Sequence, residues 1–247
     1  MNRENGGGGE QEFHLHVAWE KGPKLSPPFQ AMESLRPPGT YPLRAREVAE
    51  RVWLWCPRYV IFLDLAKREG EARLTRALDW QSVLRLIYFF SSLESDSLLL
   101  HASGVVRRER AYVFPGVSGA GKTTIVRNSP GMSVLTDEMA SVHLSGNGAK
   151  VIAHGTPFFG DWNQPGAEIS APVQGLYFPL HAPGNRLTSL TSSEVLARLL
   201  PCVVTYSTRR DRLDKLFDLA VRLAERVRGF QLGFRPNPDF WQMIDGP

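Results

Sequence analysis

Cysteine is scarce in this chain, which has only two among its 247 residues. Cys56 lies in "WLWCPRYV" and Cys202 in "LLPCVVTY", and neither has a second cysteine or a histidine at the spacing of metal ligands. A disulfide scaffold and a structural zinc site are therefore not expected. Because both cysteines stand among apolar residues, we expect them to be buried, reduced thiols.

Long apolar runs are also missing. No stretch approaches the roughly 20 apolar residues that are needed to span a bilayer. The first residues, "MNRENGGGGEQE", lack the apolar centre of a signal peptide. These two absences predict a cytoplasmic protein without a membrane partner.

Blocks of like charge are absent as well. The formal net charge is +4, but the basic residues form no run and no aromatic–basic motif. We therefore expect no nucleic-acid partner. The length and the hydrophobic content of 43% suit one α/β domain, or one such domain with an N-terminal extension. The expected fold class is α/β with a mixed (α+β) sheet.

The N-terminal part is predicted to consist of a flexible terminus, residues 1–12, and a β-rich subdomain with one helix, residues 13–94. Alternation predicts strands in "FHLHVAW", "RVWLWC" and "YVIFLDLA", and a proline-rich loop over residues 21–42. Apolar residues at helical spacing predict a helix in "WQSVLRLIYFFSSLE", and Asp79 would cap its N-terminus.

Two histidines, His14 and His16, share one face of the first predicted strand. Two histidines could contact a metal ion, but no third ligand stands nearby in the sequence. A plain strand face is the simpler interpretation.

Residues 95–247 are predicted to form one α/β domain with strands in "SLLLHASGVV", "AYVFPG", "MSVLTDE", "VQGLYFPLH", "RLTSLT" and "FQLGFRP". A hairpin with "GNG" at its tip is expected in "ASVHLSGNGAKVIAHG". Helices are expected in "KTTIVRN", in "SSEVLARLLP" and in "TRRDRLDKLFDLAVRLAERVRG". The apolar stripe of the last helix is predicted to be Leu213, Leu216, Phe217, Ala220, Leu223, Ala224 and Val227.

The stretch "GVSGAGKTT" completes the pattern Gly-x-x-x-x-Gly-Lys-Thr between a predicted strand and a predicted helix. Glycines let backbone N–H groups curl around a phosphate, and the helix that follows adds its unpaired N–H groups. Lys122 would neutralise the β and γ oxygens, and the Thr123 hydroxyl would ligate Mg²⁺. The residues predicted to bind the nucleotide are Gly116, Ser118, Gly119, Ala120, Gly121, Lys122, Thr123 and Thr124.

Two acidic residues, Asp137 and Glu138, end the strand that follows this short helix. If the helix is a crossover, the two strands run parallel, and the acids lie at the sheet edge that carries the phosphate loop. One carboxylate would then face the γ-phosphate, while its neighbour would lean elsewhere, towards a metal ion. A solvated strand end is the alternative.

His101 can be placed by counting residues across the turn "RRER". If Arg107 pairs with Arg110, His101 lies opposite Gly116, at the mouth of the phosphate loop. A histidine at this place could shuttle a proton or hydrogen-bond to an acidic neighbour. A histidine held by backbone groups at the end of a sheet is the alternative.

The order "LLLHASGVV … FPGVSGAGKTT … VLTDEMASV" resembles the catalytic domain of HPr kinase/phosphorylase, in the phosphoenolpyruvate-carboxykinase-like group of P-loop proteins. The segments "AHGTPFFGD" and "GFQLGFRPNPDFWQMI" resemble the smaller HPr-kinase-related proteins, which include kinases of lasso-peptide precursors. The resemblance covers roughly residues 95 to 244.

The resemblance implies a role for each matched residue. Asp137 would be the base that faces the acceptor hydroxyl, and His101 falls on the family's histidine before the loop. Lys122 would be the third catalytic residue. Thr123 and Glu138 would meet Mg²⁺, with Glu138 standing where the family usually has a second aspartate.

The resemblance therefore implies an ATP-dependent kinase that transfers the γ-phosphoryl group to a hydroxyl, most simply a serine of a peptide or small protein. A nucleotide-binding regulatory module and a small-molecule kinase are the alternatives. His154 and Asp161, in "HGTPFFGDWN", are secondary candidates for the site. The acceptor, the reverse phosphorolysis reaction and a homo-oligomeric state are left open.

Overall fold

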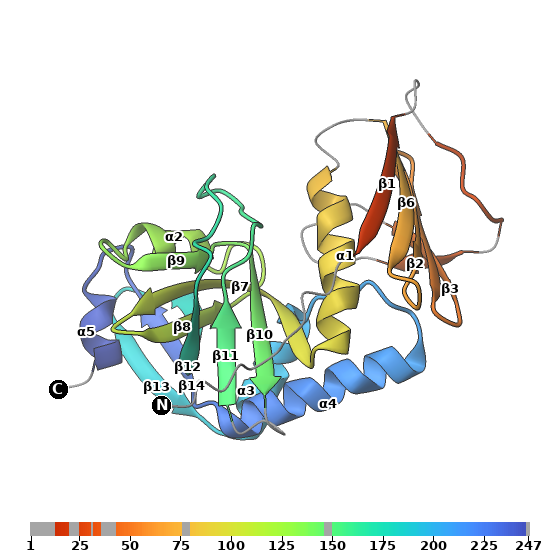
Figure 1. The fold of residues 1–247 in the computed structure, drawn as a ribbon. Helices are drawn as coiled ribbons and strands as arrows, with labels where there is room; N and C mark the ends of the chain where they lie inside the picture. The colour runs from red at the N-terminus through yellow and green to blue at the C-terminus, as the bar shows by residue number, and fades with distance from the viewer. Residues whose placement is uncertain are drawn as a thin grey trace, which may run out of the picture. The chain divides into compact units, whose positions relative to one another are not determined.

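The computed structural model describes residues 13–19, 25–30, 32–35, 43–75, 80–145 and 150–245 (Figure 1). The described residues form two compact units, which follow one another along the chain at Val83 and Leu84. The predicted flexible terminus, the predicted cap Asp79 and the "GNG" tip lie outside the described residues. Both units contain a mixed sheet, and the predicted mixed α/β class is confirmed at this level.

The first unit is a six-stranded sheet with the order β1-β6-β5-β4-β3-β2. Its strands are β1 His14–Trp19, β2 Glu33–Leu35, β3 Leu43–Val48, β4 Arg51–Cys56, β5 Tyr59–Asp64 and β6 Glu69–Leu74. Neighbouring strands from β2 to β6 are antiparallel, whereas β1 pairs with β6 in parallel. The three predicted strands are confirmed as β1, β4 and β5, but β2 lies inside the stretch predicted to be a loop.

Alternation explains why these residues form strands. In β4 the side chains of Val52, Leu54 and Cys56 are buried, while the intervening tryptophans are partly exposed. A strand with one buried face gives this period of two. Cys56 and Cys202 are both buried and free, as predicted.

The helix α1, Trp80–Glu94, belongs mainly to the second unit, since that unit begins at Leu84. Leu86, Phe89 and Leu93 are buried on one side of it, and the ring of Phe89 packs edge-on against Tyr206. The predicted helix is confirmed. The division between the two compact units falls inside α1, between Val83 and Leu84.

The second unit contains an eight-stranded sheet with the order β11-β10-β7-β8-β12-β14-β13, in which β9 also pairs with β7. β11 pairs with β12 in addition, so β7, β8, β12, β11 and β10 form a closed cycle of pairings. The strands are β7 Ser97–Arg107, β8 Arg110–Pro115, β9 Ser133–Thr136, β10 Met139–Ser145, β11 Lys150–His154, β12 Ser170–His181, β13 Arg186–Leu190 and β14 Gly229–Phe234.

The long strand β7 determines where the site residues meet. It pairs antiparallel with β8 on one edge and with β9 on the other, so β8 and β9 run parallel with β7 between them. The short helix α2, Lys122–Arg127, connects them. Pro115 at the end of β8 pairs with Ala102, and Thr136 at the end of β9 pairs with Gly104. The parallel arrangement and shared edge predicted for the two strands are therefore confirmed.

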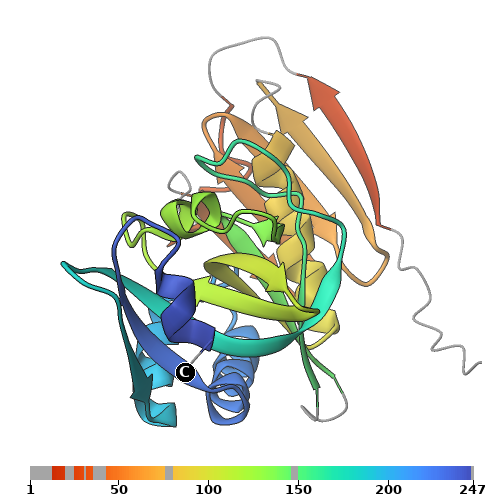
Figure 2. The same ribbon diagram turned by 90° about the vertical axis from the view of Figure 1, so that its left-hand side faces the viewer.

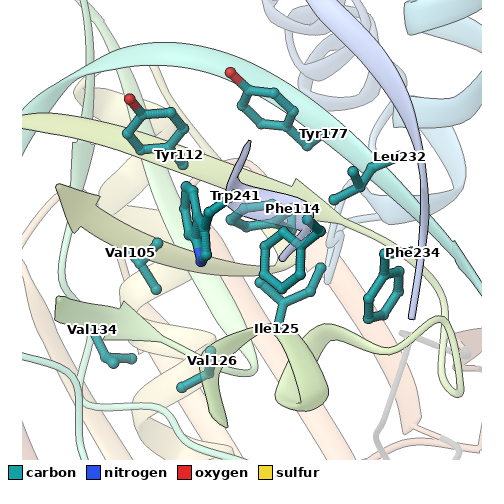
Figure 3. Close-up of a cluster of buried hydrophobic side chains, with 11 residues drawn as sticks. Val105, Tyr112, Phe114, Ile125, Val126, Val134, Tyr177, Leu232, Phe234 and Trp241 are labelled. Atoms are coloured by element: carbon teal, nitrogen blue, oxygen red, sulfur yellow. The ribbon is translucent and has the colours of Figure 1, made fainter. Parts of the chain in front are cut away.

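A cluster of aromatic and aliphatic side chains joins α2 and the C-terminal helix α5, Phe240–Asp245, to the second sheet (Figure 3). The ribbon shows α5, in dark blue, lying against this sheet (Figure 2). Ile125 and Val126 from α2 and Trp241 from α5 pack with Phe114 of β8 and Phe234 of β14. No pattern in the sequence predicts α5. Its burial of Phe240 and Trp241 shows that packing, rather than helical periodicity over so few residues, stabilises it.

The remaining helices are α3, Ser192–Leu199, a 3₁₀ turn over Leu200–Cys202, and α4, Arg210–Arg226. Thr191 and Glu194 form a capping box at the start of α3. The predicted stripe of α4 is wrong at Leu213 and Phe217, which are 39% and 52% exposed, because the buried face is centred further round the helix and includes Leu219. No helix within the described residues is long and apolar enough to cross a bilayer.

Candidate active site

The phosphate-loop motif lies where β8 ends and α2 begins, as the sequence predicts. Gly119 and Gly121 have φ angles of 81° and 99°. These angles lie in the left-handed region, where a side chain would be strained. Gly121 is also in close contact with its surroundings, since a Cβ atom there would lie 2.6 Å from Cζ of Phe234. Both glycines are therefore required by the backbone itself.

Lys122 is only 6% exposed, and its ammonium group bonds to the backbone of the loop. Its Nζ donates hydrogen bonds to the carbonyl oxygens of Gly116 (2.9 Å) and Val117 (3.1 Å). Burial lowers the pKa of Lys122, and the nearby Glu138 charge opposes this shift. Among the described residues, no carboxylate lies within ion-pair distance of Nζ. The ammonium group is therefore available to an incoming anion.

Asp137 is 1% exposed and accepts three hydrogen bonds. The backbone N–H groups of Gly160 and Trp162 donate to it at 2.7 Å and 2.8 Å, and the Thr123 hydroxyl donates to Oδ2 at 3.1 Å. This carboxylate thus holds the loop over residues 158–163 against the first turn of α2. Its orientation is fixed by groups from two separate segments of the chain.

Glu138 is placed differently from its neighbour. Its side chain is 19% exposed, and Oε1 and Oε2 lie 3.9 Å from Arg85 Nη2 and His101 Nε2. Within the described residues its carboxylate accepts no hydrogen bond. Burial raises the pKa of Glu138, and the Arg85 guanidinium works in the opposite direction. Glu138 is thus the acid of the pair that is free to bond to another molecule.

His101 lies where counting across the turn predicted it. Arg107 pairs with Arg110, and the Gly116 N–H donates to the His101 carbonyl oxygen at 3.1 Å. Its side chain is buried, and burial together with the charges of Lys122 and Arg85 lowers the pKa of His101 to about 4. The imidazole is therefore neutral near pH 7. Its approach to Glu138 at that pH is a contact between a neutral ring and a carboxylate rather than an ion pair.

Three site residues were not predicted from the sequence. Arg85 extends from α1 over the ring of Phe158, 5.7 Å from its centroid, and its buried Nε has no hydrogen-bond partner within the described residues. Gly160 makes room for the acid pair, because a Cβ there would lie 3.0 Å from Glu138 Oε2. His181 ends β12. No motif marks Arg85 or His181, whereas Gly160 lies inside "AHGTPFFGD", a segment that carries the family resemblance.

A cleft of about 320 Å³ brings most of the predicted residues together with Gly160 and His181. Gly116 and Ala120 are not among the residues that line it. They close the turn, since a Cβ on Gly116 would lie 2.8 Å from Ala120 Cβ. The secondary candidate Asp161 lines the cleft, whereas His154 does not. The lining residues are His101, Ser118, Gly119, Gly121, Lys122, Thr123, Thr124, Asp137, Glu138, Gly160, Asp161 and His181.

The oxygen ligands at the acid end of the cleft suit Mg²⁺. The Thr123 hydroxyl and the two carboxylates are hard donors, and Mg²⁺ commonly takes one or two carboxylates together with substrate phosphates. In the described part of the chain, no cluster of three or more His, Cys, Asp or Glu residues could hold a metal ion.

Another cavity, of about 330 Å³, lies in the first unit and is lined by His16 among other residues. Its remaining lining residues come from β1, β5, β6 and the turn between the last two strands. It contains no part of the phosphate-loop motif, and it is therefore not the candidate active site.

The comparisons with known proteins assign no family. No protein-family model matches this chain, and a search of curated proteins found no significant match. The functional argument therefore rests on the residues and the geometry described above.

Proposed function

We propose that this protein is an ATP-dependent phosphotransferase that moves the γ-phosphoryl group of ATP to a hydroxyl group, with Mg²⁺ as the metal. One observation carries the proposal: Asp137 and Glu138 line the same cleft as the phosphate loop, and Asp137 accepts a hydrogen bond from the Thr123 hydroxyl. A protein that only held a nucleotide would not need, in the same cleft, a second carboxylate that accepts no hydrogen bond from the described residues.

The phosphate loop supplies binding and charge neutralisation. Its backbone N–H groups and the N-terminal end of α2 surround the phosphates, and Lys122 exchanges its contacts with loop carbonyls for the β and γ oxygens. In phosphoryl transfer the transition state is loose, so positioning and neutralising charge make up most of the catalysis. These groups provide both without forming a covalent intermediate.

Asp137 belongs on the metal side of the site. Its bond from Thr123 places it beside the hydroxyl that the motif assigns to Mg²⁺, and two backbone N–H groups fix its orientation. Thr123 and Asp137 would hold Mg²⁺ here, and the ion would neutralise the negative charge that develops on the phosphates. This arrangement favours Asp137 over Glu138 as the principal metal-side carboxylate, the reverse of the roles that the family resemblance implied.

Glu138 is then the group that faces the acceptor. The acceptor hydroxyl oxygen forms a new bond to the γ-phosphorus while the bond from that phosphorus to the bridging oxygen of ADP breaks, and the hydroxyl proton passes to Glu138. Burial, which raises the pKa of Glu138, makes this carboxylate a better proton acceptor than an exposed one. The neutral imidazole of His101 and the guanidinium of Arg85 hold it from two sides.

The acceptor class rests on the resemblance to HPr-kinase-related proteins. That resemblance favours a serine of a peptide or small protein, and the order of β7, phosphate loop, α2 and acid pair in the second unit agrees with the domain it implies. The irregular loop over residues 155–169, whose Gly160 and Asp161 line the cleft, stands beside the place where the acceptor would enter.

The test is transfer of labelled phosphate from ATP to candidate peptides and small molecules. We expect Lys122→Ala to lose nucleotide affinity on the order of a hundredfold, because it removes a buried charge that the phosphates need, and to lose transfer with it. Nucleotide binding without transfer to any acceptor would favour the regulatory module, and transfer to a metabolite alone would favour the small-molecule kinase. Unchanged binding in Lys122→Ala would contradict the proposal.

A further inference from the structure

The cleft extends beyond the groups that hold phosphate and metal. His181, the last residue of β12, lines it together with Gly121 and Thr124. β12 pairs in parallel with β8, so the ends of both strands lie at one edge of the sheet. His181 therefore stands beside the phosphate loop, although nothing in the proposed transfer step uses it.

The imidazole of His181 packs against the protein on one side, and the residue remains exposed to solvent. Its ring lies 5.3 Å from the ring of buried Phe234, with 30° between the two planes. A Cβ on Gly121 would lie 3.1 Å from Cε1 of His181 and 2.6 Å from Cζ of Phe234, so both rings pack directly on the loop backbone. His181 itself is exposed. A flat ring in this position offers one face for stacking to whatever enters the cleft.

The neighbouring backbone holds this end of the cleft in place. The N–H of Arg235, just after β14, donates to Oδ1 of Asn185 at 2.8 Å, and its guanidinium donates to the Pro183 carbonyl oxygen. The segments that follow β12 and β14 are thereby tied together next to His181. His181 therefore lies at a sheet edge where hydrogen bonds link the two chain segments.

The direction of a bound nucleotide follows from the order of the strands. The acid pair comes from the β7 and β9 side of β8, and His181 comes from the β12 side. The outermost phosphates of a bound triphosphate would lie towards Thr123 and Asp137, which would hold Mg²⁺ there. The nucleoside end of the same molecule is then directed to the other flank of the loop, where His181 lies.

We propose that His181 forms a nucleobase-binding subsite, in which its imidazole stacks on the base while Phe234 supports it from behind. This inference rests on the proposed function, because it presumes that the loop binds a nucleoside triphosphate. Stacking on a π-face discriminates weakly between bases. The subsite therefore recognises that a base is present and adds affinity for ATP over bare phosphate chains.

The experiment compares two ligands, ATP and inorganic tripolyphosphate, by calorimetric titration of the full chain in the presence of Mg²⁺. We expect the unmodified chain to bind ATP about tenfold more tightly than tripolyphosphate. His181→Ala is expected to weaken ATP binding about tenfold and to leave tripolyphosphate binding unchanged. His181→Phe, which keeps a flat ring, is expected to retain the affinity for ATP.

Leu180→Ala is the matched control, because Leu180 is the adjacent residue, is 57% exposed and is not among the residues that line the cleft. It is expected to bind both ligands as the unmodified chain does. Equal losses of ATP and tripolyphosphate in His181→Ala would make the residue a phosphate contact and overturn the subsite, and so would unchanged ATP binding. If the subsite is contradicted in either way but the unmodified chain binds tripolyphosphate, the phosphate loop remains a phosphate-binding site without a nucleobase subsite. If the unmodified chain binds neither ligand, the proposed function is contradicted as well.

Discussion

The two flanks of the phosphate loop are built in different ways. On the flank of β7 and β9, Asp137 accepts three hydrogen bonds and is 1% exposed, and His101 is also buried. On the flank of β12 and β14, His181 is exposed and is held by the contact of its ring with Phe234. In the proposed function, the first flank holds the reacting groups and the second contacts the bound nucleotide. Substitutions on the first flank should therefore change the chemistry and the pH response, whereas those on the second should change affinity.

The largest expected effect distinguishes the roles of Asp137 and Glu138, the two carboxylates on the flank of β7 and β9. Glu138→Gln keeps the size and removes the proton acceptor, so we expect phosphoryl transfer to fall by about 10²- to 10⁴-fold with ATP affinity retained. Asp137→Asn is expected instead to raise the Mg²⁺ concentration needed for half-maximal transfer, because it weakens the carboxylate beside Thr123. Single-turnover transfer measured over a range of Mg²⁺ concentrations distinguishes the two.

The opposite pattern would restore the roles implied by the family resemblance. If Asp137→Asn abolished transfer at saturating Mg²⁺ while Glu138→Gln retained it, Asp137 would be the proton acceptor. Calorimetric titration with ATP serves as the control, since both variants must bind nucleotide for the comparison to hold.

The next effect concerns stability, because His101 is buried. Its pKa is lowered to about 4 in the folded chain, so on acidification the unfolded chain takes up the proton first. Between pH 7 and pH 5 this residue should lower the free energy of unfolding by about 2 kcal/mol. The stabilisation is present at pH values above the pKa of His101 in the unfolded chain, and it is lost as the pH falls towards 4.

Urea unfolding of the unmodified chain and of His101→Asn at pH 7 and pH 5 measures this contribution. The variant should lose less stability than the unmodified chain over that interval. The raised pKa of Glu138 acts in the opposite direction, but it is present in both proteins and largely cancels in the difference. The same pH response in both proteins would show that His101 is not buried as described.

The smallest effect tests how Glu138 is held. Arg85→Met removes the charge 3.9 Å from Glu138 and keeps most of the side-chain length, and we expect kcat for transfer to fall about tenfold. Arg85→Lys should recover part of this loss, because it restores a positive charge. KM for ATP should stay unchanged in both, since Arg85 is not among the residues that line the cleft. A loss of ATP affinity, or equal losses in Lys and Met, would assign Arg85 to packing alone.

Local patterns predicted much of the second unit. The turn count from Arg107 to Arg110 placed His101 beside Gly116, and the crossover rule placed the ends of β8 and β9 at one edge. Both inferences depend on contacts between residues that are close in the sequence or linked by one short helix. Packing decides the two features that these patterns did not predict correctly: the buried stripe of α4, which was wrong at two residues, and the helix α5, which was not predicted.

The sequence by itself determined the phosphate loop, the strand before it and the acid pair after it, because residue type and short spacing specify them. Only the tertiary structure decided which carboxylate bonds to Thr123 and which stays open, since Gly160 and Trp162 reach Asp137 from a distant loop. It also brought Arg85 and His181 to the site. Helix and strand periods describe how one segment repeats, and they carry no information about which segments meet.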